Sequence, residues 1–157
     1  MIDVILKRFE KPDEARIFEK GKFELVEIGG MTIGRATYEP GWKWSEHVGK
    51  AMGAKSCQVE HIGMVVSGVA TAAMDDGRVI EMHPGDVFYI PPGHDSWVVG
   101  SEPYVSLHFM GAGDYAREHK KYRRGLARQD NSRFTPPRGV RQRRKKTKCR
   151  IHRLLTD

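Results

Sequence analysis

The sequence has little cysteine and no long apolar run. Its two cysteines, Cys57 and Cys149, lie far apart, and neither belongs to a Cys-x-x-Cys pair. We therefore expect neither a disulfide framework nor a thiolate zinc site. The N-terminus lacks the apolar core of a signal peptide, and no stretch reaches the roughly 18 apolar residues of a membrane helix. These absences favour a cytoplasmic protein that does not cross a membrane.

Acidic residues are scarce at one end of the chain only. Residues 117–157 hold 16 Lys and Arg against 3 Asp and Glu, whereas residues 1–116 hold 11 against 17. The chain is thus predicted to be a mildly acidic domain over 1–115, including an N-terminal strand and helix arm, followed by a basic extension over 116–157. The extension has too few apolar residues after its first part, which is expected to be helical, to form a core.

The basic extension has two interpretations. One is a nucleic-acid arm whose Lys and Arg contact phosphates without recognising sequence. The other is a solvated extension that binds polyanions only weakly. No aromatic residue follows Phe134, so the base stacking that single-strand binders use is missing.

Helix-forming periodicity is also rare. A short helix is expected from Lys11 to about Gly21, and another over 112–127. Elsewhere, short alternating or apolar segments are separated by Gly, Pro and Asp turns, which predicts an all-β sandwich or closed barrel. The expected strands are 2–9, 23–28, 31–38, 42–48, 57–66, 69–74, 79–82, 87–90, 96–99 and 104–110.

The stretch from Gly85 to Trp97 is the most informative part of the chain. A turn precedes the apolar strand Val87–Ile90, and Pro91-Pro92-Gly93 ends it because two successive prolines donate no N–H. His94 and Asp95 follow this rigid corner. Two titratable side chains at the end of a buried strand are well placed to face a ligand.

Two spaced motifs in this region resemble those of the cupin superfamily of small jelly-roll barrels. In the second motif, five residues separate Gly85 from Pro91, and Gly93 follows two positions later. In the first, five residues separate Gly41 from His47. The resemblance covers about residues 30–110. It implies an all-β double-stranded β-helix, and by analogy a homodimer, with a short helix and the basic tail after it.

The sequence departs from the cupin pattern at three ligand positions. Gly49 stands where the second histidine of the first motif is expected, and His61 stands at the glutamate position. Ser96 occupies the third histidine position, with His94 two residues earlier. A shift of two keeps a side chain on the same face of an extended segment, since the side-chain period there is two.

The resemblance implies a divalent metal bound by His47, His61 and His94, with His108 as a fourth candidate ligand. Neutral imidazoles suit zinc, iron, manganese, nickel or copper, which the sequence does not distinguish. The alternative is a metal-free barrel in which the same histidines bind an organic anion or bond within the core.

Glu60 and Asp95 are the candidate catalytic acid or base. The first hypothesis is a metal-dependent enzyme acting on a small organic molecule in the barrel, for which the resemblance implies chemistry of oxygenase, isomerase or lyase type. The second is a non-catalytic, regulatory barrel that binds a small ligand without metal. The third is a nucleic-acid accessory protein acting through the basic tail.

Overall fold

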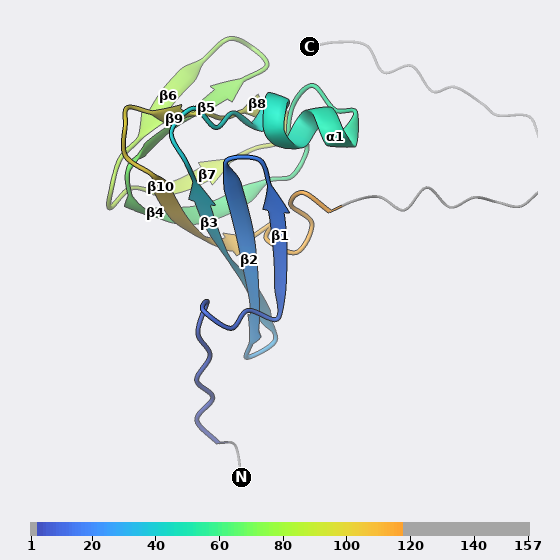
Figure 1. Cartoon of the computed structure of the whole chain (residues 1–157), viewed down its shortest axis with the longest axis vertical. Helices are drawn as coiled ribbons and strands as arrows, with labels where there is room; N and C mark the ends of the chain where they lie inside the picture. The colour runs from blue at the N-terminus through green and yellow to red at the C-terminus, as the bar shows by residue number, and fades with distance from the viewer. Residues whose placement is uncertain (1–2, 118–157) are drawn as a thin grey trace, which may run out of the picture. The chain divides into compact units, whose positions relative to one another are not determined.

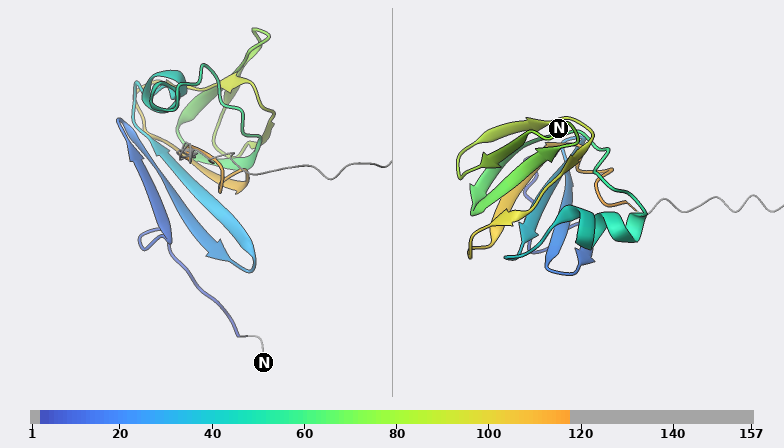
Figure 2. Two further views of the ribbon diagram at one scale, coloured as in Figure 1. Left: turned by 90° about the vertical axis from the view of Figure 1, so that its right-hand side faces the viewer. Right: turned by 90° about the horizontal axis from the view of Figure 1, so that it is seen from above.

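The computed structural model describes residues 3–117, whose strands form two antiparallel sheets (Figures 1 and 2). One sheet has the order β1-β2-β3-β10-β4-β7; in the other, β6 and β8 flank β5, which also pairs with β9. The elements are β1 Glu14–Phe18, β2 Gly21–Ile28, β3 Met31–Tyr38, η1 Ser45–Gly49, α1 Lys50–Met52, β4 His61–Ser67, β5 Val69–Met74, β6 Val79–Met82, β7 Val87–Ile90, β8 His94–Asp95, β9 Val98–Val99 and β10 Tyr104–Met110.

The connections are those of a jelly roll. After β3 the chain crosses to the second sheet, where Lys43 pairs with Trp97 between β8 and β9. Strands β3, β10, β4 and β7 therefore face a second set formed by the Lys43 segment, β8–β9, β5 and β6. This is the strand order of two interlocked Greek keys. The predicted double-stranded β-helix is confirmed.

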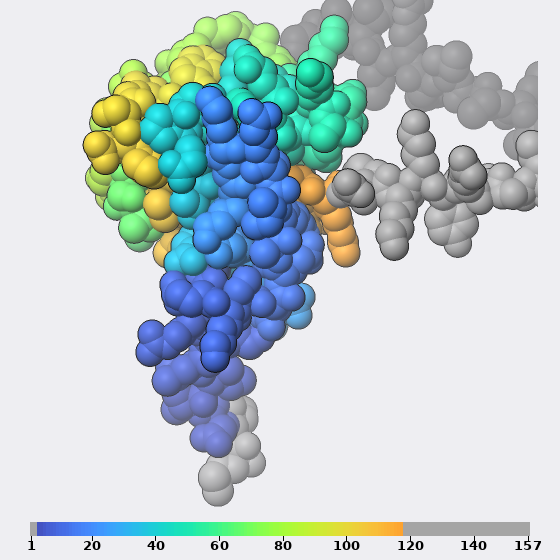
Figure 3. Space-filling model, viewed as in Figure 1, coloured from blue at the N-terminus to red at the C-terminus, as the bar shows by residue number. Residues whose placement is uncertain are grey.

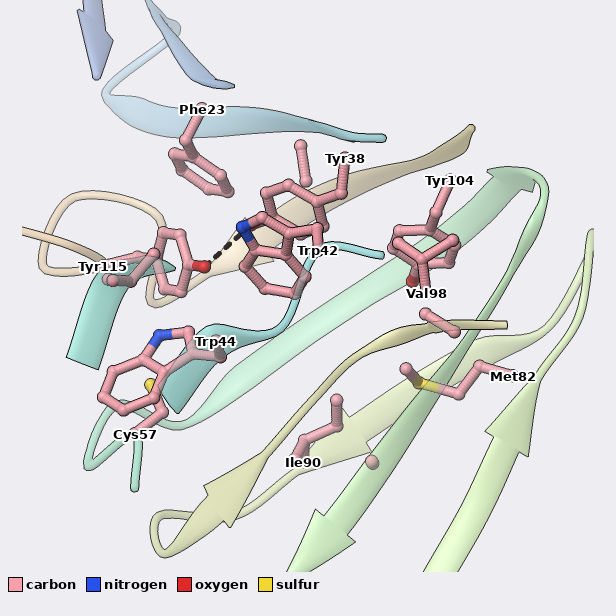
Figure 4. Packing of buried hydrophobic residues seen from close by; sticks show 14 of the residues in the cluster. Phe23, Tyr38, Trp42, Trp44, Cys57, Met82, Ile90, Val98, Tyr104 and Tyr115 are labelled. Carbon is pink, nitrogen blue, oxygen red and sulfur yellow. Dashed lines mark hydrogen bonds between the residues drawn. The ribbon is translucent and has the colours of Figure 1, made fainter. Parts of the chain in front are cut away.

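Inward-facing side chains close the barrel. Along β4, residues alternate between the buried interior and the outer face, as a period of two requires. The Tyr38 and Trp42 rings stack with centroids 3.7 Å apart and planes 5° from parallel. Figure 4 shows this pair inside the barrel with Tyr115 opposite. Large aromatic rings, rather than a wide cavity, thus occupy most of the interior.

The outer face of β2 and β3 is covered as well. Glu24, only 6% exposed, is paired with Arg35 at 2.8 Å, and the Arg35 guanidinium lies over the Phe9 ring. Glu10 accepts a second bond from the same guanidinium. These contacts explain why β2 is buried on both faces, which is unusual for a strand near a sheet edge.

Three predictions for the first part of the chain are wrong. Residues 3–8 form no strand, and the helix expected from Lys11 is replaced by strand β1. The segment β1 pairs along its whole length with β2, so tertiary pairing overrides the proline and acidic residues that favour a helix start. The strand expected over 42–48 is a single bridge followed by the π-helical turn η1.

The helix expected over 112–127 is not formed in its described part, where residues 112–116 make turns. Its remainder and the basic extension lie outside the described residues. Over residues 3–117, no helix is long and apolar enough to cross a membrane.

Gly63 of β4 is predicted to tolerate no side chain. A Cβ there would lie 2.3 Å from the Leu107 carbonyl oxygen and 2.5 Å from the Phe88 ring. We expect Gly63→Ala to lower the free energy of unfolding by about 3 kcal/mol, because the barrel cannot relax around it. Urea unfolding measures this change. Gly113→Ala is the matched control, since a Cβ at Gly113 meets no heavy atom within 4 Å; equal stability of the two variants would contradict the prediction.

Candidate metal centre

Three buried donor residues meet where the second sheet closes against β4. His61 is the first residue of β4, and His94 is the first residue of β8. Cys57 is held beside His94 by main-chain bonds: its N–H donates to the His94 carbonyl at 2.7 Å, and its own carbonyl accepts from Gly93 at 2.8 Å. Gly93 has a φ of 87°, a conformation that a side chain disfavours, so the glycine permits the corner.

One donor atom from each of Cys57, His61 and His94 lies within 4.8 Å of the others. The Cys57 sulfur is 3.6 Å from His61 Nε2, and the two imidazole rings are 5.4 Å apart at an angle of 74°. None of the three residues is more than 4% exposed. The group therefore presents one sulfur and two nitrogen donors to a common point away from solvent.

A main-chain carbonyl orients the His94 ring. His94 Nδ1 lies 2.7 Å from the carbonyl oxygen of Pro91, so Nδ1 carries the proton and donates it. Nε2 is then the unprotonated nitrogen and is available as a ligand. This partner, a backbone carbonyl at the remote ring nitrogen, is the usual support of a metal-binding histidine.

Burial sets the protonation of the group. Desolvation, aided by repulsion from His108 and His94, lowers the pKa of His61 to about 2. Desolvation also lowers the pKa of His94. It raises the pKa of the Cys57 thiol to about 11. At neutral pH the two imidazoles are therefore uncharged with free lone pairs, and the sulfur carries a proton.

His108 of β10 belongs to the same interior but not to the donor group. Its ring is 5.1 Å from that of His61, and its Nε2 lies 3.0 Å from the Ser106 hydroxyl. Desolvation lowers the pKa of His108 to about 3, so it is neutral too. It packs edge-on against His61 as part of the wall.

The interior cavity next to these histidines is small. Its volume is about 30 Å³, and its lining includes Ser96, the third-histidine position of the motif. Tyr38 donates a hydrogen bond to the Tyr115 hydroxyl at 2.8 Å across this space. Four buried nitrogens of lining residues have no hydrogen-bond partner in the described chain: Trp42 Nε1, Trp44 Nε1, His61 Nδ1 and His108 Nδ1. The two indole N–H groups are donors, so a water molecule or another hydrogen-bond acceptor bound in the cavity would satisfy them.

The structure does not bring His47 to the other histidines. It lies on η1, its Nδ1 is within hydrogen-bonding distance of both the N–H and the carbonyl of Lys43, and it lines a groove outside the barrel. The π-helical turn takes the chain out of the sheet before His47, so the face expected from strand alternation does not apply. At Gly49 a side chain would collide with Trp44 and with the Ala54 carbonyl, both 2.6 Å from a Cβ.

The two predicted catalytic carboxylates also lie elsewhere. Glu60 is exposed and accepts a hydrogen bond from the Tyr89 hydroxyl at 3.2 Å. Asp95 accepts bonds from the Ser45 N–H at 3.0 Å and the Ser45 hydroxyl at 2.8 Å, so it anchors the start of η1. Their catalytic roles stay predictions that this placement does not support.

Sequence reasoning missed Cys57. Cys57 belongs to no Cys-x-x-Cys pair, so cysteine spacing alone does not indicate a site, although three residues separate Cys57 from His61. The Cys-x-x-x-His spacing is the one feature of the sequence that could have indicated a site at Cys57. It becomes informative only when the structure shows that Cys57 pairs with His94.

No family model and no curated protein matches the sequence. Solved structures are similar at low identity. The polyketide cyclase RemF from Streptomyces resistomycificus is 16% identical, with a TM-score of 0.48 over 69% of this chain and 78% of that one. A sugar phosphate isomerase from a cupin superfamily, from Silicibacter pomeroyi, is 19% identical, with a TM-score of 0.44 over 62% and 73%.

A Klebsiella pneumoniae protein described as having a double-stranded beta-helix domain is 17% identical, with a TM-score of 0.44 over 68% of this chain and 80% of that one. At these identities and scores the similarity is one of chain path only and gives no evidence about activity.

Asp95→Ala is expected to weaken the fold rather than the metal centre. The Ser45 N–H and hydroxyl lose their acceptor, which predicts a loss of about 1–2 kcal/mol in the free energy of unfolding. Asp95→Asn, which keeps an acceptor oxygen, should retain most of that stability. Thermal or urea unfolding of the three proteins tests the prediction, and an Asp95→Ala protein as stable as the parent would refute the anchoring role.

Proposed function

We propose that the protein binds a divalent transition-metal ion through Cys57, His61 and His94 and acts on a small molecule at that centre. The observation that carries the proposal is the convergence of three donor atoms within 4.8 Å on side chains that are almost fully buried. No carboxylate belongs to this group in the described chain, so the donor set is one sulfur and two nitrogens.

The donor set favours particular metals. Thiolate and imidazole together suit zinc or copper, whereas magnesium, calcium and manganese prefer oxygen ligands. Three protein ligands also leave one coordination position open, which is typical of catalytic rather than structural zinc sites. Within the range of metals predicted from the sequence, the geometry therefore supports zinc and copper best.

A metal held there would act as a Lewis acid on an oxygen atom of water or substrate. The remaining chemistry belongs to the chain. Burial raises the pKa of both Tyr38 and Tyr115, so both stay protonated, and the Tyr115 hydroxyl, which accepts from Tyr38, keeps its own O–H to donate. The unpartnered indole N–H groups of Trp42 and Trp44 supply two donors for a bound acceptor. Neutral His108, anchored by Ser106, adds no charge.

A second candidate is metal binding without turnover. The cavity of about 30 Å³ holds roughly one water molecule and no organic substrate. The predicted acid and base, Glu60 and Asp95, accept hydrogen bonds outside it. These two observations favour a binding or regulatory role if the interior never opens.

Metal content decides whether the proposed centre exists. Full-length protein incubated with Zn²⁺ and freed of excess metal should retain about one ion per chain by elemental analysis. Cys57→Ser and His61→Gln should each weaken zinc affinity at least about tenfold, because each removes a donor or replaces it with a poorer one. His47→Gln, at the motif position outside the group, is the matched control and should bind as the parent does.

Two results would contradict the proposal. Zinc binding that is lost in His47→Gln and kept in Cys57→Ser would favour the motif ligands over the observed group. A parent protein that retains no zinc, copper or iron would support the metal-free barrel.

Metal binding should release close to one proton per ion at neutral pH. The imidazoles are already unprotonated there, while the raised pKa of Cys57, about 11, keeps its thiol protonated until metal displaces the proton. Affinity should thus rise about tenfold per pH unit between pH 7 and 9. Calorimetry in buffers of different ionisation enthalpy counts the proton. In Cys57→Ser the release should vanish, and an unchanged release there would show that the sulfur is not a ligand.

A further inference from the structure

Residues 111–117, here called the strap, form the wall between the interior cavity and the outside. Tyr115 lines the interior cavity, whereas its neighbours Ala116 and Arg117 line an outer groove of about 980 Å³. The strap follows β10 directly, and Figure 3 shows part of it, in orange, at the surface beside the blue N-terminal strands. Consecutive residues of the strap therefore line the small interior cavity and the large outer groove.

Tyr115 fills the inner end of the strap. It is 4% exposed, and its ring centroid lies 4.6 Å from that of Phe23 and 5.3 Å from that of His61. Its hydroxyl accepts the bond from Tyr38. Because this ring packs directly on a proposed ligand, removing it from the barrel would uncover His61, whose Nε2 lies 3.6 Å from the Cys57 sulfur.

Arg16 of β1 holds the strap from outside. Its guanidinium donates to the carbonyl oxygens of Tyr115 and Gly113, the latter at 3.0 Å, and Glu14 accepts a further bond at 2.7 Å. The strap belongs to no strand. In the described chain, the backbone–backbone hydrogen bonds of residues 112–117 all have both partners within residues 111–117. Side-chain contacts, rather than a sheet, therefore keep the strap closed.

We propose that the strap is the entry of the interior: it opens into the outer groove, withdraws Tyr115, and is latched shut by Arg16. The donor residues are almost inaccessible and the cavity is too small for exchange, so access requires a moving part. The strands around the site are held by ladders of main-chain bonds, whereas the strap is not. The identity of the ion or molecule that enters rests on the proposed function, whereas the opening of the strap does not.

Accessibility of the Cys57 thiol tests the latch without any metal. In metal-free full-length protein carrying Cys149→Ser, Cys57 is the one thiol, and a disulfide thiol reagent should label it slowly. Arg16→Gln should accelerate labelling about tenfold or more, since it removes hydrogen bonds from a charged donor. The control Arg78→Gln breaks an exposed pair with Asp76 and should label like the parent.

Hydrogen exchange separates strap opening from general destabilisation. Faster exchange in Arg16→Gln should be confined to the strap and to the β1 residues that hold it, with β4 and β10 protected as in the parent. Labelling unaffected by Arg16→Gln, or accelerated only in step with exchange of the whole barrel, would overturn the proposal.

The two proposals fail in different ways. Faster labelling of a protein that retains no metal would leave the strap standing and remove the metal centre. A protein that retains metal, but whose labelling in the metal-free form is unchanged by Arg16→Gln, would do the reverse.

Discussion

The structure depends on a short main-chain pairing between Cys57 and the His94 corner. Two bonds, of 2.7 and 2.8 Å, join segments that are 37 residues apart in sequence. They place the Cys57 sulfur beside the His94 imidazole. Because Pro91 and Pro92 donate no N–H, the strand before the corner ends there, and the backbone N–H groups of Gly93 and His94 bond to the Cys57 carbonyl. Backbone pairing, which any residue can make, here determines which side chains meet. The position of a functional group thus follows from a contact that its own chemistry does not specify.

Burial then gives those side chains their chemical character. The interior holds several imidazoles without a buried carboxylate among the cavity-lining residues to balance a charge. Desolvation therefore lowers the pKa of each histidine and raises that of the thiol. The apolar environment that keeps the imidazoles and the thiol neutral also makes it unfavourable to bury them without a bonding partner. A bound cation would supply that partner, so metal binding and folding would stabilise each other.

Much of the fold was predictable from the sequence because strands and turns have local signals. The strands Met31–Tyr38, Val87–Ile90 and Tyr104–Met110 have the predicted bounds, and the second motif placed the corner before His94. The site was only half predictable. Segment 42–48 alternates like a strand, yet Asp95, 50 positions away, accepts hydrogen bonds from Ser45 and a π-helical turn forms instead. A partner so distant in sequence has no effect on the local pattern, so His47 was predicted to face the barrel interior although it lies outside. Cys57 was missed for a similar reason, because its partner His94 is also far away in sequence.

The Arg16 latch also has a consequence for the order of folding. Arg16 lies near the start of the described chain and its acceptors lie 97 and 99 residues later, at the other end. During synthesis the strap follows β10 directly and is the last of the described segments to emerge, so the Arg16 contact is among the last contacts of residues 3–117 that can form. If the strands pair before the Arg16 contact forms, the donor group is assembled and still open at that stage. Metal acquired at that stage would be enclosed by the last contact to form, and its later loss would be governed by the rate of opening rather than by affinity.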